Sequence, residues 1–273
     1  METVAASFTE ASEKFSPKLP AFKTIVFGYR FVVDEWRVLV RIGWRDFLAS
    51  IAFFAASLAL DAILFGETGE LGFTYAVIPL AGYFVIGFAV RCHRYYMNGE
   101  EPEDAASEVR TAILAYGILL VKCIGLLLLP LALAAFIPAS LELPEIWLVG
   151  LAAPAILLDF YLAARMSIFF PIAAIGGHVP MRDFWFFSKG YAWKLFLILA
   201  FAPWPISLAL KLIEWLASGQ SLLLQVPLYV VAALLSFIGI AVLAIALSRA
   251  FYHCRAGQDA QLERLSEEWA DDE

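Results

Sequence analysis

Long apolar runs dominate the chain, and short polar stretches separate them. Six of the runs approach the ~20 residues that a helix needs to cross ~30 Å of hydrocarbon. We therefore predict an all-α, polytopic membrane protein with six crossings, at Phe47–Phe65, Phe73–Val90, Thr111–Ile137, Ile146–Ala164, Leu195–Leu216 and Val226–Leu247.

The stretch before the first crossing has a different pattern. Residues Ala21–Asp46 place basic side chains on one stripe of a helix, with aromatic and aliphatic residues beside them. Such a basic amphipathic helix suits the surface of the inner leaflet, although it could also pack against the cytoplasmic side of the bundle. The basic residues that we expect to contact lipid headgroups here are Arg30, Arg37, Arg41 and Arg45.

Composition supports a membrane location. Of 273 residues, 62% are apolar and only 16% are charged. A water-soluble protein of this composition could not cover itself with polar surface.

The connecting segments predict the orientation. Seventeen of the 19 lysines and arginines lie before the first crossing or after the second, fourth and sixth. The other three loops contain none, so the positive-inside rule predicts that both termini are cytoplasmic. Arg91 and Arg94, which follow the second crossing, are two further candidates for headgroup contacts.

The chain divides into four parts on this pattern. Residues 1–20 are polar, lack the features of a secretory signal, and are expected to be a disordered cytoplasmic tail. The amphipathic helix occupies residues 21–46, and residues 47–255 form the membrane domain. Residues 256–273 are an acidic cytoplasmic tail that supplies most of the net charge of −7.

Charged residues inside the apolar runs are candidate functional residues. Side-chain tilt brings Lys122 of the third crossing toward Asp159 of the fourth, so we predict an intramembrane ion pair. Asp61 is a rival partner, and Asp159 could instead bond Arg165 or Tyr161. The pair would line a polar cavity or would only fix helix packing.

Two cysteine–histidine pairs raise the question of a metal. Cys92-His93 and His253-Cys254 each lie among arginine and tyrosine after a crossing. They could form a zinc site, but adjacent helical residues point about 100° apart, so a basic and aromatic collar is the preferred interpretation. The chain has no phosphate loop, HExxH or GxSxG motif, and no metal, cofactor, catalytic residue or nucleic-acid partner is expected.

Three stretches resemble a known family. AVRCHRYYMNGEEP, YLAARMSIFFPIAAIGG and FWFFSKGYAWKLF resemble segments of uncharacterised six-helix bacterial inner-membrane proteins. These look related to the membrane domain of glycerophosphodiester phosphodiesterases. The resemblance covers roughly residues 40–255 and implies a multi-pass protein of the bacterial inner membrane. The chain lacks the phosphodiesterase barrel, so the resemblance does not imply that activity.

The predicted function is a non-enzymatic integral membrane protein that organises lipids or partner proteins. Its expected partners are membrane lipids, with a membrane-protein partner or a homo-oligomer also possible. The alternative is a small transporter or lipid-handling protein that uses Lys122 and Asp159. A membrane-embedded lipid enzyme is disfavoured because histidines and clustered carboxylates are scarce.

Overall fold

The computed structural model describes residues 18–65, 72–99, 106–141, 144–177, 184–218 and 222–271, and these ranges contain helices and turns but no strand. The all-α prediction is confirmed. In chain order the helices are α2 (Ala21–Asp34), α3 (Trp36–Phe65), α4 (Gly72–Asn98), α5 (Ala106–Ser140), α6 (Glu145–Met166), α7 (Phe169–Ala174), α8 (Phe184–Phe187), α9 (Ala192–Phe201), α10 (Trp204–Ala217) and α11 (Leu222–Asp271).

Among the described residues, three helical segments are long and apolar enough to cross a membrane. They are Ser107–Pro138 in α5, Ala192–Ala217 across α9 and α10, and Leu224–Glu263 in α11. These segments contain the third, fifth and sixth predicted crossings. The first, second and fourth predicted crossings coincide with helices α3, α4 and α6.

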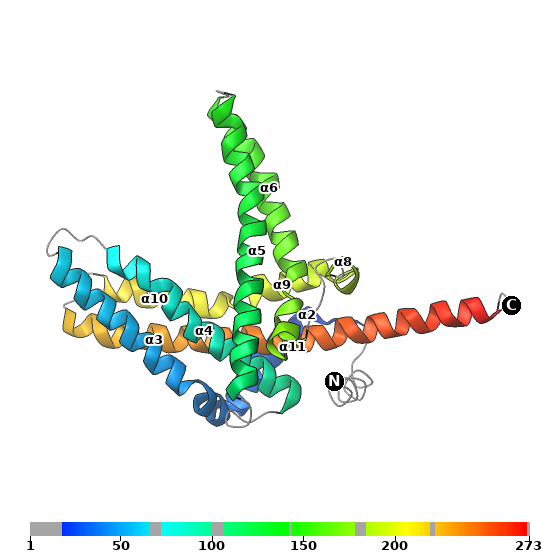
Figure 1. Ribbon diagram of the computed structural model, residues 1–273, viewed down its shortest axis with the longest axis horizontal. Coiled ribbons are helices and arrows are strands. Elements are labelled where there is room, and N and C mark those ends of the chain that lie inside the picture. The colour runs from blue at the N-terminus through cyan, green and yellow to red at the C-terminus, as the bar shows by residue number, and fades with distance from the viewer. Residues whose placement is uncertain are drawn as a thin grey trace.

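The helices form three hairpins, α3–α4, α5–α6 and α10–α11, that meet at one end. Figure 1 shows α3, α4, α10 and the first half of α11 running to one side, while the α5–α6 hairpin runs across them. The C-terminal part of α11 projects to the opposite side. The six long segments therefore do not form the parallel bundle expected of six crossings.

The core lies where the hairpins meet. Met166, Ile168 and Leu195 are almost inaccessible there and pack with the middle of α11, from Val242 to Cys254. Aromatic side chains extend this packing, and Tyr252 on α11 donates a hydrogen bond to the carbonyl of Met97 on α4, at 3.2 Å. The junction of the hairpins is thus the best-packed region that the structure describes.

Away from this junction, the hairpins expose apolar side chains. Val121, Ile146 and Leu157 are each at least 70% exposed. Only 11% of the most apolar stretch of α5 is buried inside the protein. A helix that is apolar on every side and has so little protein around it needs hydrocarbon as its solvent. This distribution fits a membrane protein.

The predicted helix Ala21–Asp46 is wrong at its C-terminal end. Helix α2 stops at Asp34, Glu35 adopts a turn conformation, and α3 then runs without interruption from Trp36 to Phe65. Residues 36–46 are therefore the first three turns of a long helix rather than part of a separate interfacial one. The predicted tail also ends earlier, because Leu19 is only 2% exposed and packs into the core.

The fifth predicted crossing is a broken helix. Pro203 separates α9 from α10, since proline cannot continue the hydrogen-bond ladder. The hydroxyl of Tyr29 on α2 donates to the carbonyl of Ala202 at 2.7 Å, and so satisfies an acceptor at the break. The break thus becomes an anchoring point for α2.

Candidate functional site

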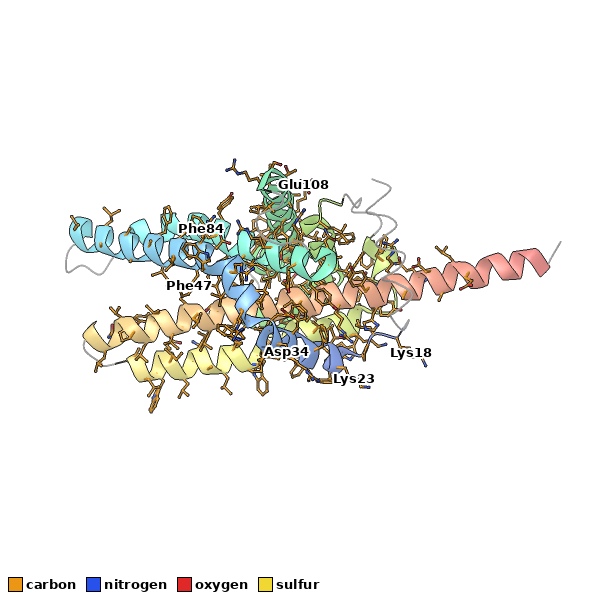
Figure 2. The ribbon with its side chains drawn as sticks, turned by 90° about the horizontal axis from the view of Figure 1, so that it is seen from below. Lys18, Lys23, Asp34, Phe47, Phe84 and Glu108 are labelled. Atoms are coloured by element: carbon orange, nitrogen blue, oxygen red, sulfur yellow. The ribbon has the colours of Figure 1, made fainter. Side chains whose placement is uncertain are left out.

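Basic and apolar side chains share the outer surface of α2 and of the first three turns of α3. The helical periodicity places them on the side that turns away from the core, and we call this surface the basic-aromatic face. Its exposed members are Phe22, Lys23, Val26, Arg30, Val33, Trp36, Arg37, Val40, Arg41, Trp44 and Arg45; Lys23 is labelled in Figure 2.

The opposite side of α2 is held firmly against the core. Thr24 and Ile25 are buried, and a Cβ on Gly28 would lie only 2.9 Å from the carbonyl oxygen of Val242. The guanidinium of Arg249 on α11 lies 3.9 Å from the centre of the Phe27 ring. Helix α2 therefore packs on the junction with one side and exposes the other, and its position on the inner leaflet stays a prediction.

Two arginines of the basic-aromatic face lie over neighbouring indole rings. Arg37 is 5.7 Å from the ring centre of Trp36, and Arg45 is 5.4 Å from that of Trp44. Tryptophan prefers the headgroup level of a bilayer, so this stacking would hold a guanidinium at the same depth. Arg30 and Asp34 form an exposed ion pair at 3.6 Å, which offsets one of the positive charges.

Arg91 and Arg94, the other two residues predicted to contact headgroups, form ion pairs between helices. Arg91 on α4 forms an ion pair with the buried carboxylate of Asp46 on α3. The side chain of Arg94 is 5% exposed and pairs with Glu108 at the start of α5, at 3.0 Å. Both arginines therefore join helices, and their contact with lipid headgroups stays a prediction.

The two cysteine–histidine pairs are buried in the core, on α4 and α11, and they do not form a metal cluster. Cys92, His93, His253 and Cys254 are all buried, and His93 Nδ1 lies 2.7 Å from Ser248 Oγ on α11. Among the described residues, no group of three or more histidine, cysteine or acidic side chains could hold a metal ion. The hydrogen bond joins α4 to α11, so its evident role is packing.

The burial of His93 predicts a dependence of stability on pH. His93 lies beyond the predicted crossing of α4, and its burial lowers its pKa to about 3, whereas an unfolded chain has a histidine pKa of about 6.5. Between these values only the unfolded state binds the proton, so stability falls as pH falls. From pH 7 to pH 5 the loss should be about 2 kcal/mol, measured as the free energy of unfolding in detergent.

The variant His93→Gln keeps a polar group beside Ser248 but cannot titrate. It should lose about 2 kcal/mol less than the parent between pH 7 and pH 5. An unchanged pH dependence would show that His93 is not buried in its neutral form. The comparison of two proteins cancels the contribution of the other titrating groups.

The predicted Lys122–Asp159 ion pair is not formed. Both carboxylate oxygens of Asp159 are covered, yet neither has a hydrogen-bond partner among the described residues. Asp159 shares one side of α6 with the buried residues Ala155 and Leu162, while Lys122 is exposed on α5. The two residues lie at similar positions along their helices, but their side chains leave the helices on sides that do not face each other.

The other proposed partners of Asp159 are engaged elsewhere. The Arg165 guanidinium lies 4.9 Å from the ring centre of Tyr161 and 4.2 Å from that of Trp185, and it donates to the carbonyl of Trp185 at 3.2 Å. The side chain of Asp61, the rival partner predicted for Lys122, lies outside the described part of the structure. Asp159 thus stands as a covered carboxylate without a bonded partner in the described residues.

No family model, curated protein or solved structure matches this chain. The resemblance to the membrane domain of glycerophosphodiester phosphodiesterases therefore stays a prediction.

Proposed function

We propose that this chain is a non-enzymatic, multi-pass protein of the bacterial inner membrane that gathers anionic lipids at the cytoplasmic leaflet. The observation that carries the proposal is the basic-aromatic face, which lies beside the junction of three apolar hairpins. Each basic residue near an anionic surface contributes about 1 kcal/mol of attraction. The neighbouring indole rings would set the depth of the arginines at the headgroups.

In this proposal all three hairpins cross the bilayer, and both termini are cytoplasmic. The uneven distribution of lysine and arginine supports this orientation. The exposed surface of α5 supports crossing by the α5–α6 hairpin, because a helix that lies in the interface needs a polar face and α5 has none. The hairpin would turn about Ser167 and Ile168, the short connection between α6 and α7, to align with the others.

The proposal is tested by the lipids that the protein retains. We would reconstitute it in nanodiscs of equimolar phosphatidylglycerol and phosphatidylcholine and measure the retained lipids by native mass spectrometry. Phosphatidylglycerol should be enriched at low salt, and the enrichment should shrink near 1 M salt, where the screening length falls to about 3 Å. A retained composition equal to the bulk mixture at low salt would contradict the proposal.

A transporter or lipid-handling role at Lys122 and Asp159 is a second candidate. The covered carboxylate of Asp159 favours it, because polar groups without partners inside a membrane domain often belong to a functional site. The exposure of Lys122 and the absence of the ion pair weaken it. A substrate of this site would have to supply the bonding partner that Asp159 lacks.

A further inference from the structure

An open groove of about 420 Å³ lies between the α3–α4 hairpin and the outer half of α11. Ser50, Ile51 and Ala55 line it from α3, Val85 lines it from α4, and residues between Val226 and Ile240 line it from α11. Its lining is almost entirely apolar, and it contains no charged side chain among the described residues. The groove is therefore suited to hydrocarbon.

The dimensions of the groove favour one hydrocarbon chain. The fourteen residue steps from Val226 to Ile240 correspond to roughly 21 Å along α11, at 1.5 Å per residue. Spread over that length, the volume gives a cross-section of roughly 20 Å², or a width near 5 Å. Carbon atoms contact one another at about 4 Å, so one acyl chain fits this width.

Aromatic rings pack together near the end of the groove that is nearest the junction. The ring of Phe237 on α11 lies 5.4 Å from that of Phe47 and 5.0 Å from that of Phe88, measured between ring centres. Figure 2 shows Phe47 on α3, at the side of the helix near α11. Beyond these rings the groove continues outward along α11 as far as Val226.

The groups along α3 follow the order of the parts of a phospholipid. Arg45 and Trp44 come first, on the basic-aromatic face, and Ser50 follows about 7.5 Å farther along the helix. Ile51 and Ala55 come next, in the groove. On a helical wheel Trp44 lies within about 20° of Ile51, so it shares the side of α3 that faces the groove.

Ser50 adds an independent observation at the point where the two surfaces meet. Its hydroxyl oxygen is buried and has no hydrogen-bond partner among the described residues. Buried polar atoms nearly always form hydrogen bonds, so an unpaired hydroxyl beside a groove indicates that a polar group of a ligand binds there. The ester oxygens of a phospholipid lie between its phosphate and its acyl chains, which is the level of Ser50 in this arrangement.

We propose that this groove binds one acyl chain of an anionic phospholipid, with the headgroup at Arg45 and Trp44 and the ester group at Ser50. The preference of this site for an anionic headgroup rests on the proposed function. The binding of an acyl chain in the groove does not depend on that function. The basic-aromatic face would then do more than attract a mobile lipid layer. It would hold one particular lipid between two hairpins.

The test blocks the groove by introducing a phenylalanine ring into its lining. We would compare the parent with Ala233→Phe and Ala55→Phe in equimolar phosphatidylglycerol and phosphatidylcholine nanodiscs, by native mass spectrometry with increasing collision energy. The parent should keep one phospholipid after the other lipids are stripped, and both variants should lose that mass. Ala135→Phe, which adds the same ring to an exposed position on α5, should keep it.

The outcomes separate the groove from the proposed function. Retention of the last lipid by both groove variants, with unchanged thermal unfolding, would overturn the groove site. Its loss from Ala135→Phe as well would also overturn the site, because the effect would not be local. If the last lipid is lost only from the groove variants but is drawn equally from the two headgroups, the groove stands and the anionic preference is overturned.

Discussion

Replacing Arg37, Arg41 and Arg45 with glutamine is expected to abolish most of the preference for anionic lipid. These three arginines are exposed on the first turns of α3. At about 1 kcal/mol for each charge near an anionic surface, the loss is about 3 kcal/mol, or roughly 150-fold in relative affinity. The ratio of retained phosphatidylglycerol to phosphatidylcholine, measured by native mass spectrometry, gives this change directly.

A matched variant separates the face from the net charge. Arg110→Gln, Lys189→Gln and Lys194→Gln together remove the same charge from the predicted cytoplasmic side, at positions outside the basic-aromatic face. This triple variant should keep most of the preference, since screening confines each charge to its own neighbourhood. Equal losses in the two triple variants would mean that total charge matters and that the face has no special role.

Two aspartates should respond in opposite ways to the same substitution. Asp159→Asn should stabilise the protein, because it removes a covered carboxylate that has no bonded partner in the described structure. Insertion scales give a cost of about 2.5–3.5 kcal/mol for an aspartate in the centre of a crossing helix. We expect a gain of about 1–3 kcal/mol in the free energy of unfolding.

Asp46→Asn provides the control. Asp46 is 7% exposed and pairs with Arg91 between α3 and α4. Removing its charge should destabilise the protein by about 1–3 kcal/mol, because the Arg91 guanidinium then loses its partner. The two free energies would be measured under the same detergent and denaturant conditions. Destabilisation by Asp159→Asn would indicate a partner for that carboxylate in the folded state.

The sequence predicts the helices well because apolar runs of membrane length are a strong signal. Each of the six predicted crossings coincides with helical structure, and the proline break at Pro203 is visible in the sequence. The break at Glu35 is not visible. Gly28 and Leu39, buried on either side of it, lie about 20° apart on a continuous wheel, so the periodicity shows no change of phase.

Pairing between helices is harder to predict. A sequence shows how far along a helix a residue lies, but it shows less well toward which neighbour its side chain points. The distances of Lys122 and Asp159 from the helix ends suggest contact, yet the neighbour of Lys122 on α5, Cys123, is the residue that is buried. The partners of Arg91 and Arg94 lie 45 and 14 residues away, at Asp46 and Glu108. No pattern in the sequence identifies them, and the groove is equally hidden, because its lining comes from three helices.

The position of Leu141 relative to the membrane tests the six-crossing topology most directly. Leu141 lies at the tip of the α5–α6 hairpin and is exposed, while the native cysteines Cys92, Cys123 and Cys254 are buried. In intact bacterial cells, a membrane-impermeant maleimide should label Leu141→Cys, and it should label Lys189→Cys only after the membrane is permeabilised. Labelling of Leu141→Cys only after permeabilisation would place the hairpin tip in the cytoplasm and contradict the topology.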